Sequence, residues 1–367
     1  MTRKIQIAYV CTSLGWGGLE MNHLKNAQWM KNRGHHVLLV CTKNSPLHVA
    51  ALKCELSIIA IRKPSKHYAF LSAFLLQKIL LRKGVEHVFI RSTFDLSLAA
   101  SLSFFSRKRL KTHYFMEMMF HQQKRQFFRT LRYASLTSWI CSLNYMKSFV
   151  LRFTHVSAQK VKIVPSGFDF STLSHLPKTE ARKQLNLPQD AAIFGMIGRI
   201  DRKKRLELAI KALNELKNEP FHLLIVGEET PDSKDTYLDD VKRLISQGGL
   251  EKRIHFFGFH EDPYPFYRAI DALIMASDFE TFGMSTIEAF AHDTPVIASD
   301  NGGSKELLTL FPYGALFKAG DFLSLSAAMS QLPDFSNQHL SKEAFRAVFD
   351  HERVCEMVET SILSLDS

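Results

Sequence analysis

Two acidic residues in the C-terminal half have the spacing expected of a sugar-phosphate site. Glu280 and Glu288 have seven residues between them, in a segment that runs from an apolar strand-like run into a helical pattern. Free N–H groups at the start of a helix bind anions, and here they belong to Gly283, Met284 and Ser285. Carboxylates repel a phosphate but accept hydrogen bonds from hydroxyls. The pattern therefore indicates a phosphate flanked by sugar or ribose hydroxyls.

A simpler interpretation of the same residues stays open. Ser285 and Glu288 also fit a capping box, in which Glu288 only returns to the N–H of the cap residue. Glu280 by itself fits an ordinary solvated carboxylate of a loop.

A cluster of cations follows the strand expected at 192–198. Arg199 and Lys204 lie in the turn between that strand and the next helix, and a guanidinium with an ammonium suits a diphosphate. The alternative is a solvated basic helix start. It is disfavoured because cations at a helix N-terminus oppose the helix dipole, a cost that a bound anion offsets.

The third motif is a glycine-rich turn, Gly15-Trp-Gly-Gly18 with Glu20, which follows the first expected strand. It is not a complete G-x-G-x-x-G pattern, and no acidic residue ends the second strand, so a nicotinamide dinucleotide site is poorly supported. Close approach of a phosphate or a substrate to this turn remains plausible, although the signal is weak by itself.

Apolar runs alternate with amphipathic stretches along most of the chain. The first half predicts strands at 5–12, 37–42, 85–90, 112–118 and 160–169 and helices at 19–33, 69–83 and 122–153. The second half predicts strands at 192–198, 222–227, 254–259, 272–276 and 295–299 and helices at 204–217, 236–247, 264–270, 285–292, 303–309 and 341–364. Strands of this kind form parallel sheets covered on both faces. We therefore predict an α/β fold with two doubly wound, Rossmann-like domains that face each other across a cleft.

The charge changes sharply along the chain and marks a domain boundary. Residues 1–172 carry 26 Lys and Arg against 6 Asp and Glu, a net charge of +20, whereas residues 173–367 have a net charge of −9. We predict an N-terminal domain at 1–171, a C-terminal domain at 172–345 and a final helix at 346–367. The basic first domain is expected to face an anionic partner.

The composition excludes several classes of protein. The 367 residues are too many for a single core, and 17 Gly with 12 Pro are too few for a fibrous or low-complexity chain. Five widely spaced cysteines favour a reducing compartment over a disulfide framework or a zinc site. The apolar stretches at 68–81 and 96–105 are shorter than the roughly 18–20 residues that cross a bilayer. Any membrane contact is therefore expected to be peripheral.

Two segments of the basic half interleave cations with large apolar residues, at 106–111 and 123–132. Such surfaces suit an anionic membrane. Nucleic acid is the competing polyanion, but the sequence has no recognisable nucleic-acid-binding module, and we predict none as partner. A merely solvated basic face is the third interpretation.

Together these motifs resemble the family-4 retaining glycosyltransferases of the GT-B fold, over nearly the whole chain. The resemblance rests on the residues above and on Arg33-Gly-His-His-Val37 and Val164-Pro-Ser-Gly-Phe-Asp169. It is close in the C-terminal half and poor over 44–155.

The resemblance implies a role for each residue of the motifs. Arg199 and Lys204 would hold the donor diphosphate, and Glu288 the ribose hydroxyls. Glu280 would hold the donor sugar with the backbone from Phe282 to Met284. Gly17 and Gly18 would face the phosphates, the base would lie near Phe259, and the final helix would cross back onto the first domain.

Two departures from the family pattern stand out. Arg205 replaces the glycine that usually follows the lysine. Glu117 stands where a histidine is common, so Glu117, His113, His121 and Asp95 are all candidates for contact with the acceptor hydroxyl.

These observations predict a retaining glycosyltransferase with a nucleoside diphosphate sugar as donor. A UDP-sugar is favoured, a GDP-sugar is possible, and neither a prosthetic group nor an essential metal is expected. The acceptor is expected to be an anionic glycolipid or a lipopolysaccharide-type polysaccharide, with the protein in the cytoplasm, peripheral at the cytoplasmic face of the inner membrane. A nucleotide-sugar epimerase, a phosphorylase of the same fold and a silent membrane-associated scaffold are the alternatives.

Overall fold

The computed structural model describes residues 3–65, 69–120, 124–229 and 236–363, which form two compact units. The first unit comprises the chain up to Gly167 and the C-terminal segment from His351, and the second unit comprises Phe168–Asp350. The sequence analysis predicted the ranges 1–171, 172–345 and 346–367. The five cysteines are all unpaired.

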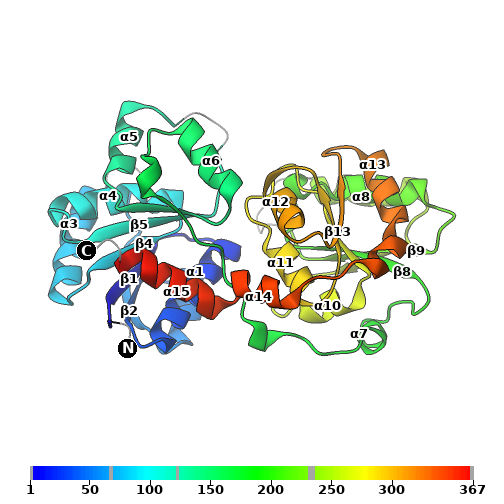
Figure 1. The fold of residues 1–367 in the computed structure, drawn as a ribbon, viewed down its shortest axis with the longest axis horizontal. Coiled ribbons are helices and arrows are strands. Elements are labelled where there is room, and N and C mark those ends of the chain that lie inside the picture. Colours follow the sequence, from blue (N-terminus) through cyan, green and yellow to red (C-terminus); the bar gives the residue numbers. More distant parts are fainter. Residues whose placement is uncertain (1–2, 66–68, 121–123, 230–235, 364–367) are drawn as a thin grey trace. The chain divides into compact units, whose positions relative to one another are not determined.

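The first unit is a doubly wound parallel sheet. Its described strands lie in the order β3-β2-β1-β4-β5-β6-β7 (Figure 1). They are β1 (Gln6–Cys11), β2 (His36–Thr42), β3 (Ser57–Ile61), β4 (His87–Ile90), β5 (Lys111–Met116), β6 (Ser138–Cys141) and β7 (Val161–Ile163). The helices are α1 (Gly18–Asn32), α2 (Pro46–Leu52), α3 (Phe70–Arg82), α4 (Leu96–Phe105), α5 (Phe127–Ala134), α6 (Asn144–Phe153) and α15 (His351–Leu363).

The second unit repeats this architecture, with described strands in the order β10-β9-β8-β11-β12-β13. They are β8 (Ala192–Ile197), β9 (Phe221–Val226), β10 (Ile254–Phe257), β11 (Ala272–Met275), β12 (Val296–Ser299) and β13 (Gly314–Phe317). The helices are α7 (Lys178–Gln184), α8 (Leu206–Glu215), α9 (Tyr237–Gly248), α10 (Tyr264–Ala269), α11 (Met284–Ala291), α12 (Gly302–Leu310), α13 (Phe322–Ser330) and α14 (Lys342–Phe349). The predicted fold class, two doubly wound α/β domains, is confirmed.

Each sheet has one point where the chain changes its direction of winding. In the first unit the chain adds β2 and β3 on one side of β1 and then returns to add β4 on the other side. In the second unit the same reversal lies between β8 and β11. Loops that leave neighbouring strands in opposite directions open a crevice at such a point, where α/β proteins bind their ligands.

The C-terminal helix α15 packs on α1 in the first unit (Figure 1). Glu359 of α15 is buried and accepts hydrogen bonds from Arg33 Nε at 2.6 Å and Nη2 at 3.0 Å, and it contacts His35 Nε2 at 2.9 Å. These partners hold the pKa of Glu359 below its usual value although burial opposes the shift. The Arg33–Val37 motif therefore attaches the end of the chain to the first unit.

Two predictions about secondary structure are corrected, and several elements were not predicted. The single helix at 122–153 is instead α5, β6 and α6, because a short strand buried on both faces gives an apolar run that periodicity alone cannot separate from a helix. The helix at 341–364 is two helices, broken where the extended Asp350 pairs with Phe168. The sequence pattern did not predict α2, β3, α4, α7, β13 and α13.

Candidate functional site

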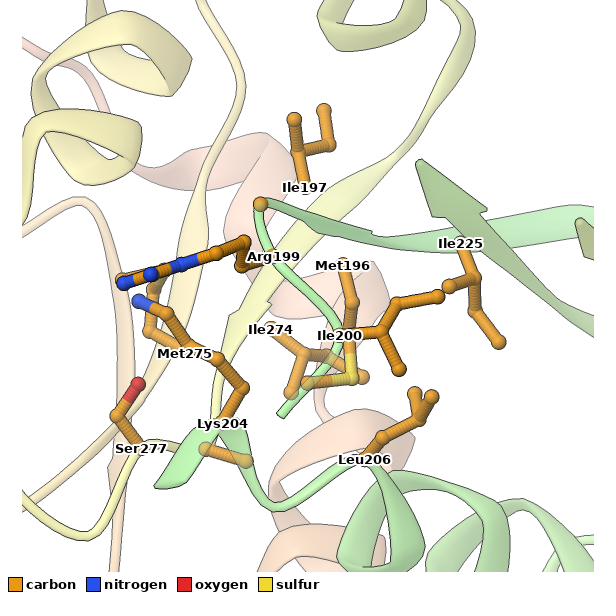
Figure 2. A pocket seen from close by; sticks show the side chains of 12 residues that line it. Met196, Ile197, Arg199, Ile200, Lys204, Leu206, Ile225, Ile274, Met275 and Ser277 are labelled. Carbon is orange, nitrogen blue, oxygen red and sulfur yellow. The ribbon is translucent and has the colours of Figure 1, made fainter. Parts of the chain in front are cut away.

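The strongest candidate site of the second unit lies at the carboxyl ends of β8 and β11. Gly198 and Arg199 follow β8, and Ser277 to Glu280 follow β11, so the two predicted motifs meet at the reversal of this sheet. A small cavity of about 30 Å³ opens between them, and both Arg199 and Lys204 line it. In Figure 2 these two side chains extend to the same side, while Met196, Ile200 and Ile274 form an apolar base.

A tight turn carries the cations of this site. The Asp201 carboxylate accepts hydrogen bonds from the backbone N–H of Lys203 at 3.0 Å and of Lys204 at 3.2 Å, which fixes one 3-10 turn. Arg205 then begins α8 in the left-handed conformation, with φ 55° and ψ 43°. A side chain is disfavoured there and glycine is not. Glycine would therefore be favoured at this position, and Arg205 adopts the left-handed conformation at a cost.

The lysine of one motif pairs directly with an acid of the other. Lys204 Nζ lies 2.8 Å from Glu280 Oε2, and Ser277 Oγ donates to the same oxygen at 3.1 Å. The Arg199 side chain stays two-thirds exposed, 3.9 Å from Asp201. The sequence analysis did not single out Ser277, although its place just past β11 is the signal that would have found it.

Two glycines of α12 set the position of the Glu280 loop. The N–H of Gly303 donates to the Glu280 carbonyl at 2.7 Å. A β-carbon on Gly303 would lie 2.6 Å from the carbonyl oxygen of Phe282, and one on Gly302 would overlap the Glu280 carbonyl. Backbone meets backbone at this contact, so no side chain can move aside to make room.

The start of α11 is the place where the sequence predicts a bound anion. Gly283 is its N-cap at φ 94°, and no side chain caps this end of the helix. The buried hydroxyls of Thr286 and Ser304 lie close to Gly283 and have no hydrogen-bond partner among the described residues. Donors and acceptors that lack protein partners indicate a place where a bound oxygen is accommodated.

Glu288 and Ser285 do not form the capping box that was left open as the simpler interpretation. Ser285 Oγ donates to the Ile197 carbonyl at 3.2 Å, and Glu288 Oε2 accepts from the Tyr267 hydroxyl at 2.6 Å. Burial and the neighbouring Glu288 raise the pKa of Tyr267, which stays protonated as a donor. Tyr267, on α10, orients Glu288, and no sequence motif marked it.

The two aromatic residues expected near the donor differ in exposure. Phe259 follows β10 and is exposed, with its N–H bonded to Glu228 at 3.1 Å. The Phe282 ring is buried and packs on Phe349 with 6.1 Å between the ring centroids. Only the backbone of Phe282 is therefore suited to contact a ligand.

The first unit has its own polar cluster at the reversal between β1 and β4. Glu117 follows β5 and forms an ion pair with Arg91, which follows β4. Asp95 is fully buried and accepts from the N–H of Thr12 at 3.2 Å and from its hydroxyl. Burial raises the pKa of Glu117 above its usual value and that of Asp95 to about 6. Arg91 was missed, although it stands directly after a predicted strand.

The remaining candidates are the glycine-rich turn and the histidines, and they differ in how accessible they are to a ligand. A β-carbon on Gly17 would meet only the end of the Glu20 side chain, and one on Gly18 would meet nothing, so the turn is open to close approach. His113 instead lies inside the sheet, bonded to His87 at 3.0 Å and to Ser138 at 2.8 Å. Burial lowers its pKa, as expected of a structural residue. His121 lies outside the described residues.

Metal-ligand clusters and membrane spans are absent from the described parts of the chain. No group of three or more His, Cys, Asp or Glu there has the geometry to hold a metal ion. None of the helices in those ranges has the length and the apolar character that crossing a bilayer requires.

Sequence comparison identifies the family of the second unit. Residues 177–344 match the family model described as Glycosyl transferases group 1. The mannosylfructose-phosphate synthase of Agrobacterium fabrum is 24% identical over 78% of this chain and 65% of its own length. The lipopolysaccharide core biosynthesis mannosyltransferase LpsB of Rhizobium meliloti is 32% identical over 36% of this chain and 38% of its own. The chain thus spans less than two thirds of the length of these relatives.

Structural comparison covers the whole chain. The Anabaena protein Alr3699/HepE, solved in complex with UDP and glucose, superposes with a TM-score of 0.83 and 19% identity, over 98% of this chain and 100% of that one. The sucrose-phosphate synthase of Thermosynechococcus elongatus superposes with a TM-score of 0.80 and 19% identity, over 99% of each chain. This chain therefore has the GT-B fold, and its residues 177–344 match the glycosyl transferases group 1 family.

Proposed function

We propose that the protein is a retaining glycosyltransferase that moves a sugar from a nucleoside diphosphate donor to a hydroxyl of a glycolipid or lipopolysaccharide-type acceptor. The contact between Lys204 and Glu280 at the β8/β11 reversal carries the proposal. It brings a cation that can bind the diphosphate next to a carboxylate that can accept hydrogen bonds from sugar hydroxyls. The group 1 family match favours transfer over an epimerase, a phosphorylase or a silent scaffold. A UDP-sugar is the favoured donor, since a neighbour of the same fold was solved with UDP and glucose. A GDP-sugar remains the second candidate.

The cationic end of the second unit is assigned to the leaving diphosphate. Arg199, Lys204 and the open start of α11 would neutralise the charge that develops as the bond to the sugar breaks. Side-chain cations and backbone N–H groups in these positions supply the role that a metal ion has in other transferases, so we expect no metal requirement.

The acids are assigned to the two sugars of the donor. Glu288, oriented by Tyr267, would accept from the ribose hydroxyls, and Glu280 would accept from the transferred sugar. The base would lie near the exposed ring of Phe259. In a retaining reaction the acceptor hydroxyl attacks from the face that the diphosphate leaves, and a phosphate oxygen takes its proton.

The polar cluster of the first unit is assigned to the acceptor. Glu117 and the glycine turn at Gly17 and Gly18 stand at the ligand-binding edge of that sheet. Glu117, held by Arg91, is the group we assign to the acceptor hydroxyl. The net charge of +20 on residues 1–172 supports peripheral contact with an anionic membrane, which we place at the cytoplasmic face of the inner membrane.

The donor site is tested by substitution with a matched control. Lys204→Ala removes a cation of the site, whereas Lys203→Ala removes its exposed neighbour in the same turn. We expect Lys204→Ala to lower kcat by about 100- to 1,000-fold, the usual effect of losing one group that stabilises the transition state. Lys203→Ala should keep most of the activity, and Glu288→Ala should lose activity while Glu288→Gln retains part of it.

Donor identity is tested by thermal unfolding with UDP, GDP and ADP and their sugars. A nucleotide present at about 100 times its dissociation constant stabilises the folded state by about 2.7 kcal/mol. Full transfer activity in both Lys204→Ala and Glu288→Ala would overturn the site assignment.

A further inference from the structure

Helix α3 of the first unit is apolar on both of its faces. Its inner face is buried through Ala73, Leu76 and Leu80, and the helix packs on α4. Its outer face is also apolar and exposed, with Leu71 72% and Leu75 53% accessible. A helix that is hydrophobic all round is normally buried on both sides, by other parts of a protein or by lipid. The described residues of this chain provide cover on one side only.

The end of α4 extends this apolar surface. Phe105 packs edge-on against Phe70 and Phe74 of α3, with ring centroids 6.5 and 5.6 Å apart. Phe104, in contact with Phe105, is 75% exposed. In Figure 1 the two helices lie next to each other, as their many contacts require. We call this surface the α3–α4 face, formed by Phe70, Leu71, Phe74, Leu75, Ile79 and Phe104.

Cations of α3 and of the turn after α4 adjoin the α3–α4 face. Lys78 lies over the Phe74 ring at 4.2 Å, and Arg82 follows it one turn later. Arg107 and Lys108 project from a left-handed turn directly after α4, with φ of 52° and 63°. Between residues 56 and 116 the only carboxylates are Glu86, paired with Arg3, and the buried Asp95.

A second surface of the same composition stands beside α4. Helix α5 contacts α4 and exposes Phe127 and Phe128, 75% and 74% accessible, next to the basic Arg129 and Arg132. Exposed aromatic rings with cations on the same short helix match the composition of helices that lie in the headgroup region of a bilayer.

We propose that the α3–α4 face is a membrane-docking surface that inserts its apolar side chains into an anionic lipid bilayer. The apolar residues would enter the boundary between headgroups and acyl chains, while Lys78, Arg82, Arg107 and Lys108 contact lipid phosphates. An apolar surface with cations along its edge complements a bilayer, whose interior is apolar and whose headgroups are anionic. The biological role of this surface rests on the proposed function, in which the acceptor is a glycolipid. Binding of the protein to vesicles can be measured without any nucleotide-sugar donor.

Vesicle sedimentation tests the proposal. We expect the full chain to bind vesicles of phosphatidylcholine with about 30 mol% phosphatidylglycerol and to bind pure phosphatidylcholine at least about tenfold more weakly. Leu71→Ser/Phe104→Ser should lower the partition coefficient on the anionic vesicles by about tenfold or more, because two large side chains no longer insert. Arg107→Gly/Lys108→Gly, which suits the left-handed turn, should lower binding and reduce its dependence on salt.

The matched control changes two exposed apolar residues on another helix of the same unit. Val49 and Leu52 of α2 are 54% and 65% exposed, and Val49→Ser/Leu52→Ser should bind vesicles as the wild type does. Equal binding by Leu71→Ser/Phe104→Ser and the wild type would overturn the proposal. So would a dimer in light scattering that the same substitution dissociates, because the face would then cover a second copy of the chain.

The outcome separates this inference from the proposed function. UDP-dependent thermal stabilisation without vesicles reports the donor site alone. Vesicle binding without any nucleotide effect would retain the docking surface and reject the transferase, and the reverse result would reject only the docking surface.

Discussion

The two sheets have the same topology, but the ligand-binding edges that they present differ in chemistry. In the second unit the cations are the accessible groups: the Arg199 side chain is 67% exposed and that of Lys204 33%, and Lys204 faces the less exposed Glu280 of the opposite loop. In the first unit the charges are buried, and the carboxylates of Glu117 and Asp95 have raised pKa values.

This contrast shows that similar folds can prepare two different kinds of ligand contact. Exposed cations on a rigid turn keep their charge for a phosphate group. Buried acids with a raised pKa can form a hydrogen bond with a hydroxyl in either protonation state. In the proposed function this difference in burial would separate the donor contact from the acceptor contact, because the order of six strands is common to both sheets.

Breaking the Arg91–Glu117 pair is expected to have the largest effect. Arg91→Met leaves a buried carboxylate without its cation, which costs about 3–5 kcal/mol. All three tryptophans, Trp16, Trp29 and Trp139, belong to the first unit, so tryptophan fluorescence during urea unfolding reads this loss directly. Unchanged stability would show that the first cluster is as solvated as the second. Trp139 itself is buried next to Tyr114 and provides the signal change.

Asp95 provides a pH-dependent version of the same test. Its pKa rises from 3.8 in the unfolded chain to about 6 in the folded protein because of burial. Below the lower value both states hold the proton and there is no cost. Between pH 3.8 and about 6 the unfolded chain ionises Asp95 while the folded protein keeps its proton, so the folded state loses up to about 3 kcal/mol of stability, and the loss is complete above pH 6. Asp95→Asn should therefore gain stability relative to the wild type between pH 4 and pH 7, by tryptophan fluorescence, and a constant difference would contradict the burial of this charge.

Gly303→Ala tests whether the second site depends on rigid loop contacts. The new β-carbon meets the Phe282 carbonyl, and overpacking of this kind costs about 1–3 kcal/mol. We expect kcat to fall further than stability, because a displacement of about 1 Å in a site costs about 100-fold in rate. Gly248→Ala, whose β-carbon meets only side-chain atoms, is the control. Equal activity of the two variants would contradict the claim that Gly302 and Gly303 position the Glu280 loop.

Arg205 should give the smallest effect. Arg205→Gly removes the left-handed strain and also the ion pairs to Glu207 and Asp278, so we expect a stability change within about 1 kcal/mol. Arg205→Val keeps the unfavourable φ with a β-branched side chain and should be less stable than Arg205→Gly by about 1–2 kcal/mol. Circular dichroism during heating measures both.

The sequence predicted the second unit better than the first. Its strands are separated by helices with clear turns, and the predicted strands from 192–198 to 295–299 match β8 to β12. In the first unit β6 is a short buried run between two amphipathic helices, which periodicity merged into one. The basic, aromatic pattern at 123–132 was recognised, but the α3–α4 face was not. An apolar helix can be exposed on one face, and which face this is depends on tertiary packing that a single sequence does not reveal.

The same limit applies to the sites. Residues that follow a predicted strand, such as Arg199 and Glu280, are found from sequence because the strand end fixes their place. Tyr267 and Ser304 reach the site from other elements, and their positions depend on how α10 and α12 pack.

The central claim is that the second unit binds a diphosphate through Lys204 and its neighbours, and calorimetric titration tests it most directly. UDP, UMP and uridine are titrated into the wild type and into Lys204→Ala. The account predicts that UDP binds the wild type at least about tenfold more tightly than UMP does, a difference of about 1.4 kcal/mol, and that Lys204→Ala removes most of this difference. Equal affinity for UDP and uridine, or a Lys204→Ala variant that distinguishes them as the wild type does, would contradict it.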